Sequence, residues 1–185
     1  MKKILVIQTA FIGDVVLATS LIENLHQQLP EVRIDILVRK GNESLFESHP
    51  FLNQVLVWDK KNNKYQNWVG LLFKIRSSQY DVVINAQRFA ATGAWTALSG
   101  AKIKIGFDKN PFSFLFTNSL VHQFSDKGQH EIDRNHQLLS SLFVTKVAMP
   151  KLYPTASDEL AVINYQQAPY LCIAPASVWF TKQFS

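Results

Sequence analysis

Residues 3–16, which read KILVIQTAFIGDVV, decide the fold class of this chain. The aliphatic run over residues 3–8 is typical of a strand buried on both faces in a parallel sheet. A short loop with Gly13 follows, and apolar residues then recur at the spacing of one helix face, at Val15, Ala18, Leu21, Ile22, Leu25 and Leu29 before Pro30. A strand, a short loop and a helix in this order begin a unit of the α/β class.

The rest of residues 1–150 repeats this alternation of short apolar runs and helical stripes. Further strands are predicted at residues 32–38, 54–58, 81–86 and 102–106, with a sixth at 119–122. Helices are predicted at residues 43–49, 68–75, 89–98 and 131–143. The pattern predicts a doubly wound, mainly parallel α/β sheet, in which ligands bind beyond the carboxyl ends of the strands where the strand order reverses.

The pattern changes after residue 150. Residues 151–169, which contain Pro154 and Pro169, are interpreted as a linker between domains. Tyr170–Ala174 is predicted to be the first strand of a second domain that begins in residues 170–185. Because one strand is not a domain, we expect the chain to stop inside this second domain.

The composition is that of an ordinary soluble domain, with 47% hydrophobic residues and Cys172 as the single cysteine of 185 residues. One cysteine excludes an internal disulfide and a zinc site of four cysteines. The apolar run after the amino terminus is too short for a secretory signal, and no stretch approaches the ~20 residues of a membrane span. We therefore expect a cytoplasmic location.

The formal net charge of +5 has two interpretations. It can serve solubility alone, or it can attract an anionic partner such as a phosphorylated substrate or an acidic lipid surface. The sequence contains no nucleic-acid-binding motif, so a nucleic acid partner is not expected.

The loop after the first strand is a candidate ligand site, because a helix amino terminus favours anions. The dinucleotide fingerprint needs three glycines where this loop has only Gly13, which argues against a nucleotide-binding oxidoreductase or a flavodoxin-like protein. Asp14 has two interpretations. It is either the N-cap of the helix or a carboxylate that meets a substrate hydroxyl at the end of the first strand.

Five colinear motifs resemble glycosyltransferase family nine, the heptosyltransferases. The resemblance begins with residues 4–16, and it continues at YDVVINAQ (80–87), GAKIKIGFD (100–108), HEIDRN (130–135) and APASVWFTK (174–182). These motifs span essentially the whole chain. The resemblance implies a GT-B architecture of two Rossmann-like domains, of which residues 1–150 would be the acceptor-side domain and residues 170–185 the start of the donor-binding domain.

The resemblance also implies a reaction. The enzyme would transfer a heptose or related sugar from a nucleotide-sugar, with ADP-heptose as the expected donor, to a lipopolysaccharide-core acceptor. Transfer would proceed with inversion and without a metal ion or cofactor, and Asp14 would be the general base. We expect these 185 residues alone to be inactive. The alternative is a stand-alone α/β module that binds a nucleotide or a carbohydrate without transferase activity.

The same resemblance assigns binding residues on both sides of the reaction. The predicted acceptor-binding residues are Gln87, Arg88, Lys109, His130 and Arg134. The predicted donor-binding residues are Gly13, Ser177, Thr181 and Lys182. Without the resemblance, the charged members of both sets are equally well explained as solvated surface groups, and His130 as a polar residue at a helix start.

Three phenylalanines alternate with other residues at Phe112, Phe114 and Phe116. This spacing favours a half-buried strand or a loop that packs on the core. The alternative is an apolar lip that meets the lipid chains of the acceptor, with peripheral contact at the inner face of the cytoplasmic membrane.

Overall fold

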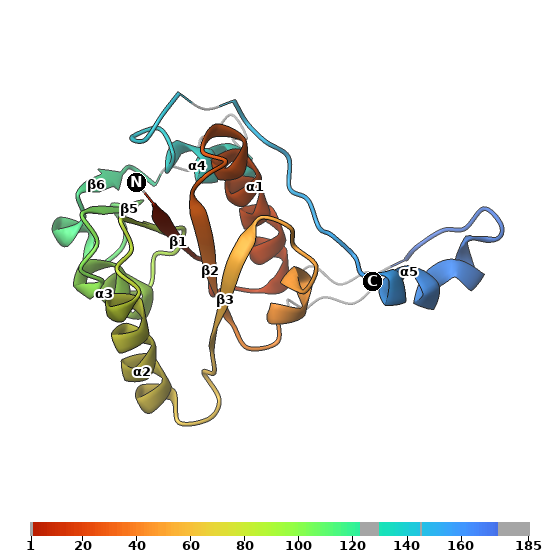
Figure 1. Ribbon diagram of the computed structural model, residues 1–185, viewed down its shortest axis with the longest axis horizontal. Coiled ribbons are helices and arrows are strands. Elements are labelled where there is room, and N and C mark those ends of the chain that lie inside the picture. The colour runs from red at the N-terminus through yellow and green to blue at the C-terminus, as the bar shows by residue number, and fades with distance from the viewer. Residues whose placement is uncertain (1, 123–129, 145, 174–185) are drawn as a thin grey trace, which may run out of the picture. The chain divides into compact units, whose positions relative to one another are not determined.

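A six-stranded parallel sheet forms the centre of the molecule (Figure 1). The computed structural model describes residues 2–122, 130–144 and 146–173. The strands pair in the order β3-β2-β1-β4-β5-β6, and all five pairings are parallel. They are β1 (Lys3–Ile7), β2 (Arg33–Arg39), β3 (Leu52–Trp58), β4 (Val82–Asn85), β5 (Ile103–Phe107) and β6 (Asn118–Leu120). This order confirms the predicted doubly wound, Rossmann-like sheet.

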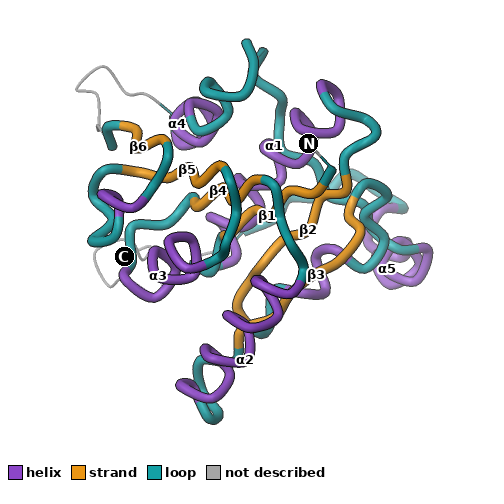
Figure 2. The backbone as a smooth tube through the Cα atoms, turned by 60° about the vertical axis from the view of Figure 1, so that its left-hand side comes forward, coloured by secondary structure: helices purple, strands orange, loops and turns teal. Residues whose placement is uncertain are grey.

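Helices cover both faces of the sheet. In the described part of residues 1–153, they are α1 (Ile12–Gln28), α2 (Lys64–Ser77), α3 (Ala90–Leu98) and α4 (Glu131–Gln137). Figure 2 shows α1 and α4 on one side of the strands and α2 and α3 on the other. The alternation of side chains along β1 explains this division, because Ile4 and Val6 belong to the core under α1, whereas Leu5 and Ile7 belong to the core under α2 and α3.

Helix α1 buries the face that its sequence predicts. Its members Val15, Ala18, Leu21, Ile22 and Leu25 are fully buried against β1, β2 and β4. The helix ends at Gln28, and Leu29 closes it with a backbone hydrogen bond to the carbonyl of Leu25. Pro30 then prevents its continuation.

Two predicted elements differ in the structure. The predicted helix at 43–49 is a 3-10 turn, η1 (Glu43–Phe46). Helix α4 ends six residues before the predicted boundary at 143, because the chain turns through bonds between residues three apart, from Leu138 to Asn135 and from Ser140 to Gln137. Of the strand or loop expected around Phe112–Phe116, the structure has a loop, which contains a second 3-10 turn, η2 (Ser113–Leu115).

The phenylalanines around η2 have different surroundings. Phe112 and Phe116 are half-buried, and the Phe116 ring lies so close to Gly106 that a Cβ there would be 2.5 Å from it. Phe114, in contrast, is 78% exposed. Packing on the core therefore explains two of the three rings.

The chain divides into two compact units, residues 1–153 and 154–185. In the second unit the structure describes residues 154–173, which contain α5 (Ala156–Val162) and the 3-10 turn η3 (Ile163–Gln166). Helix α5 begins with a capping box between Thr155 and Asp158, a signal that the linker interpretation missed. The predicted strand at 170–174 is wrong over 170–173, because no strand within residues 154–173 offers the backbone partners that a strand requires. Ala174 lies outside the described residues.

A buried histidine, His49, lies beside helix α1. His49 is 7% exposed and packs against the ring of Tyr153, with 4.9 Å between the ring centroids. Burial, and then the neighbouring His26, lowers the pKa of His49 to about 4. At neutral pH the ring is therefore uncharged, and its 3.8 Å approach to the Glu23 carboxylate is neither an ion pair nor a hydrogen bond.

We expect this histidine to make the stability of the fold depend on pH. In the unfolded chain His49 takes up a proton below pH ~6.5, whereas in the folded chain it stays neutral down to a pH of about 4. The unfolded state therefore binds more protons in this window, and its free energy falls relative to the folded state as pH falls from 6.5 to 4. After allowing for residual solvent screening, the loss is about 2 kcal/mol. Urea denaturation at several pH values measures it, and His49→Gln should flatten the dependence; equal slopes in both proteins would contradict the assignment.

Candidate functional site

A cleft of about 450 Å³ opens where the strand order reverses, at the carboxyl ends of β1 and β4. The connection after β1 leads to α1 on one face of the sheet, and the connection after β4 leads to α3 on the other. The two connections separate at this edge and leave room between them. The cleft thus occupies the position that the predicted topology assigns to a ligand.

Two buried glutamines hold the floor of the cleft together. Gln8 follows β1 and Gln87 follows β4, and the side-chain amide of Gln87 donates a hydrogen bond to Oε1 of Gln8. The same oxygen accepts the backbone N–H of Ala10 at 3.3 Å, and Oδ1 of Asn85 accepts the backbone N–H of Gln87 at 2.9 Å. The floor is therefore a hydrogen-bonded bridge between the two connections.

Asp14 lies on the wall of this cleft. Helix α1 begins at Ile12 with Phe11 as its N-cap, so Asp14 is the third residue of the helix and is half-buried. The interpretation of Asp14 as the N-cap is wrong, because the extended backbone of Phe11 already ends the loop. In the first turn the carboxylate still benefits from the positive end of the helix dipole.

Cations from several elements surround Asp14. The cleft is lined by Arg39 at the end of β2, Lys60 after β3, Arg88 after β4 and Arg134 in α4. Because every strand is parallel, the carboxyl ends of β2, β3 and β4 all bring their following residues to this edge of the sheet. The cleft is therefore electropositive and suits an anionic group.

Local contacts fix two of these cations. The Lys60 ammonium donates a hydrogen bond to the carbonyl of Thr9 at 3.1 Å and lies 4.5 Å from the centre of the Trp58 ring. The Arg39 guanidinium lies 5.0 Å from the centre of the Phe11 ring. Burial, followed by the repulsion of Arg39 and Lys64, lowers the pKa of Lys60. The lowering therefore reflects the burial of the Lys60 ammonium first and the neighbouring positive charges second.

Glu131, Arg134 and His122 form a second group of polar side chains that lines the cleft. Arg134 is buried and forms an ion pair with Glu131, three residues earlier in α4. Burial, and then Arg88, lowers the pKa of Arg134. Burial, followed by Arg134 and Arg88, also lowers the pKa of His122. Two arginines and a histidine thus crowd one end of the cleft.

Two carboxylates line the cleft within the described residues, and they differ in their partners. Glu131 is paired with Arg134, whereas no hydrogen bond or ion pair within the described residues engages the carboxylate of Asp14. Asp14 is therefore the carboxylate that can accept a proton from a ligand in this cleft.

The predicted site residues fall into three groups. The structure brings together Asp14, Gln87, Arg88 and Arg134. It places Gly13, Lys109 and His130 at exposed positions that do not line the cleft, and His130 caps α4 by accepting the Ile132 N–H at 3.2 Å. Ser177, Thr181 and Lys182 lie outside the described residues.

Sequence reasoning missed Arg39, Lys60, Glu131 and His122. Arg39 directly follows a predicted strand and Lys60 is the second residue after one, so a search for charged residues at strand carboxyl ends would have found them. Glu131 and His122 have no comparable signal, because the packing of α4 and of the segment after β6 brings them to the cleft.

The model of glycosyltransferase family 9 (heptosyltransferase) matches residues 68–185, which is more than half of the chain. The chain belongs to glycosyltransferase family 9. This confirms the predicted family. Among its relatives, the lipopolysaccharide heptosyltransferase 3 of Escherichia coli is 25% identical over 154 residues, which cover 80% of this chain and 45% of that protein.

Solved structures of the family share the fold. The crystal structure of the family 9 glycosyltransferase from Veillonella parvula superposes with a TM-score of 0.77 at 22% identity, covering 89% of this chain and 48% of that one. The E. coli heptosyltransferase WaaC with ADP gives a TM-score of 0.64 at 18% identity, covering 81% and 50%. The chain spans about half the length of the relatives it matches. In its described part, no helix combines the length and apolar character needed to cross a membrane.

The buried side chain of Asn110 also holds the loop that carries Gln87. Asn110 is 1% exposed and donates hydrogen bonds to the carbonyls of Gln87 at 3.2 Å and Phe89 at 3.1 Å. Gly93 in α3 leaves the space that Asn110 occupies, because a Cβ on Gly93 would lie 1.9 Å from Oδ1 of Asn110.

We therefore expect Gly93→Ala to displace Asn110 and to destabilise the chain by about 1–3 kcal/mol through overpacking. Gly70→Ala is the matched control, because Gly70 also lies in a helix but has nothing within 4 Å of an added Cβ. That variant should be neutral or stabilising by up to about 1 kcal/mol, since alanine is the better helix former. Chemical denaturation compares the two, and equal effects would show that Asn110 yields easily.

Proposed function

We propose that the full-length protein is an inverting glycosyltransferase in which Asp14 is the general base. The observation that supports this proposal is the position of the Asp14 carboxylate, which no hydrogen bond or ion pair within the described residues engages, in a cleft that four cations line at the strand reversal. The Asp14 carboxylate would take the proton of an acceptor hydroxyl while the hydroxyl oxygen attacks the anomeric carbon of the donor. The bond from that carbon to the diphosphate oxygen would break, and the nucleoside diphosphate would leave.

The cleft residues suit an anionic acceptor. Arg39, Lys60, Arg88 and Arg134 would bind phosphate or carboxylate groups next to the sugar that presents the hydroxyl. The amides of Gln8 and Gln87 lie below them and can orient sugar hydroxyls. We propose a lipid-linked oligosaccharide of the lipopolysaccharide core as the acceptor, because the matched relatives are lipopolysaccharide heptosyltransferases.

The donor would be held by the part of the protein that follows these residues. We propose ADP-heptose as the donor, because solved structures of one relative, E. coli WaaC, contain ADP in one case and ADP-2-deoxy-2-fluoro heptose in the other. Gly13, Ser177, Thr181 and Lys182 remain the predicted donor contacts, and Lys109 and His130 remain predicted acceptor contacts. The reaction would need no metal ion and no cofactor besides the nucleotide-sugar substrate. Because the acceptor carries a lipid, the protein would work in the cytoplasm at the inner face of the membrane.

The test of the base is Asp14→Asn in the full-length protein. Removal of a general base lowers kcat by about 10²–10⁴-fold, or roughly 3–5 kcal/mol of barrier, with donor and acceptor saturating. Since Phe11 is the N-cap, the change removes no capping hydrogen bond and should leave the melting temperature nearly unchanged.

Asp133→Asn is the matched control. Asp133 is also the third residue of its helix, α4, and it does not line the cleft. It therefore loses the same interaction with a helix dipole but no chemistry, and kcat should stay near the wild-type value. A turnover rate of Asp14→Asn within about threefold of wild type would reject Asp14 as the base.

A further inference from the structure

Positive charge is concentrated in one part of the chain. Residues 60–107 contain one acidic residue, Asp81, and eight basic ones, namely Lys60, Lys61, Lys64, Lys74, Arg76, Arg88, Lys102 and Lys104. This segment carries a formal charge of +7, and the rest of the chain therefore sums to −2. The segment builds β4, β5 and the α2–α3 layer that covers one face of the sheet. Such an asymmetry points to an extended anionic partner.

Helix α2 carries more apolar surface than the core uses. Leu71 and Ile75 are buried in the core, and Trp68 and Leu72 pack at its margin. Beyond them, Tyr65, Val69 and Phe73 recur at intervals of four residues and are 80%, 44% and 67% exposed. Residues at this interval share one side of a helix, so these three form a continuous exposed ridge, the α2 stripe. A helix needs an apolar sector of only about 100° to pack on the core, so the core does not account for the α2 stripe.

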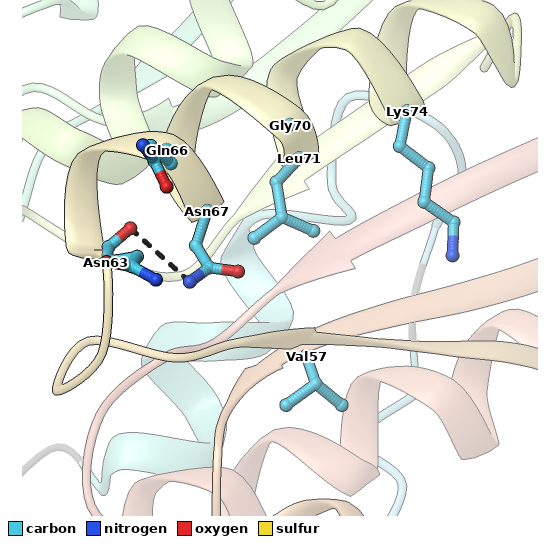
Figure 3. A pocket seen from close by; sticks show the side chains of 7 residues that line it. All are labelled: Val57, Asn63, Gln66, Asn67, Gly70, Leu71 and Lys74. Atoms are coloured by element: carbon cyan, nitrogen blue, oxygen red, sulfur yellow. Dashed lines mark hydrogen bonds between the residues drawn. The ribbon is translucent and has the colours of Figure 1, made fainter.

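The other flank of α2 is polar. Figure 3 shows Asn63, Gln66, Asn67 and Lys74 around a hollow of about 380 Å³ beside Val57 of β3, with Asn67 donating to the Asn63 carbonyl at 3.3 Å. Helix α2 thus has a buried side, a polar side and an apolar exposed side. In Figures 1 and 2 it is the outermost element of its layer.

Basic side chains stand at both ends of the α2 stripe. Lys64 lies 5.7 Å from the centre of the Tyr65 ring at the amino end of the helix. Arg76 is exposed at the carboxyl end and donates to the carbonyl of Leu98 at 2.7 Å. No acidic residue occurs in α2. Apolar rings bordered by basic groups are the pattern of a surface that binds the interface of an anionic bilayer.

An apolar hollow continues from the stripe toward the cleft. About 310 Å³ in volume, it lies between the amino ends of α2 and α3 and is lined by Trp58, Tyr65, Trp68 and Phe112 with Lys64 at its edge. Tyr65 belongs to both the hollow and the stripe. Trp58 links the hollow to Lys60 of the cleft, because the Lys60 ammonium lies over its ring.

We propose that the α2 stripe, with Lys61, Lys64 and Arg76, docks the protein on an anionic phospholipid bilayer. The stripe would enter the headgroup region, and the basic groups would meet lipid phosphates. A second copy of the chain is a poorer occupant, since a symmetric contact would bring two strongly basic layers together. The inference rests on the proposed function only in linking this surface to a lipid-borne acceptor; binding to lipid is independent of catalysis.

Vesicle sedimentation of the full-length protein tests the proposal, with phosphatidylcholine vesicles compared with vesicles that also contain phosphatidylglycerol. Wild type should bind the anionic vesicles, and added salt should weaken binding. Lys61→Gln with Lys64→Gln should lower the partition coefficient by roughly fivefold for each charge. Tyr65→Ser with Phe73→Ser should lower it at least about tenfold.

Matched variants control for charge and for exposed apolar area. Lys146→Gln with Lys151→Gln removes the same charge from exposed positions outside the basic segment, and Leu160→Ser removes an apolar side chain that is 67% exposed, like Phe73. Both should bind vesicles like wild type. Unchanged vesicle binding by the Tyr65/Phe73 variant would overturn the proposal. So would a wild-type dimer, seen by light scattering, that this variant dissociates while neither protein binds vesicles.

Transfer to an acceptor stripped of its acyl chains separates this proposal from the catalytic one. The stripe variants should keep wild-type turnover on that water-soluble acceptor, whereas Asp14→Asn should lose it. If Asp14→Asn stays active while the stripe variants lose vesicle binding, the catalytic proposal fails and the docking surface stands.

Discussion

The parallel pairing of all strands, with its reversal between β1 and β4, is the constraint on which the rest of this structure depends. Because the strands run in one direction, the residues that follow β1, β2, β3 and β4 all arrive at one edge of the sheet. Because the connections after β1 and β4 leave toward opposite faces, that edge cannot close over itself. The hydrogen bond between Gln8 and Gln87 spans the gap at its floor and keeps the cleft at a defined width. A functional side chain placed after any of these strands is therefore brought to the same place, whatever its distance along the chain.

The electrostatics of the cleft follow from this convergence. Several cations meet at one edge, and the fold stabilises them individually through the Thr9 carbonyl, the Trp58 and Phe11 rings and the Glu131 carboxylate. Asp14 stands outside these pairings: no hydrogen bond or ion pair within the described residues engages its carboxylate, and the helix amino terminus supports it. An aspartate is a much weaker base than an alkoxide, so in the proposed reaction the proton would move late, after the donor bond has largely broken. The surrounding cations would hold the acceptor in place during that step rather than share in the proton transfer.

The sequence predicted the elements whose apolar pattern is complete. Burial on both faces of a parallel sheet leaves a continuous apolar run at Ile4–Ile7, and burial of one helix face leaves its spacing in Val15–Leu25. It failed where tertiary context decides. The carboxyl end of α4 depends on packing, and a strand at Tyr170 needs neighbours that residues 154–173 do not supply. Of the site, Asp14 was singled out by its position after the first strand, and Gln87, Arg88 and Arg134 were assigned through the family resemblance. Glu131 and His122 were missed because their approach to the cleft depends on how α4 and the end of β6 pack, which no local spacing encodes.

The α2 stripe and the cleft would act together, because docking on the bilayer changes the concentration of acceptor that the cleft meets. An enzyme held on a bilayer meets a lipid-anchored acceptor in two dimensions, so the effective concentration of acceptor rises without any new contact in the cleft. If the cleft also bound the acceptor tightly, the product would leave more slowly, and the capture of the acceptor would not improve. The cleft of this chain fits such a division, because Lys60 and Arg88, two of the cations that line it, are exposed. If α2 supplies affinity for the surface and the cleft supplies alignment, changes at Tyr65 or Phe73 alter the acceptor concentration needed for half-maximal rate on membranes. Changes at Asp14 alter the rate itself.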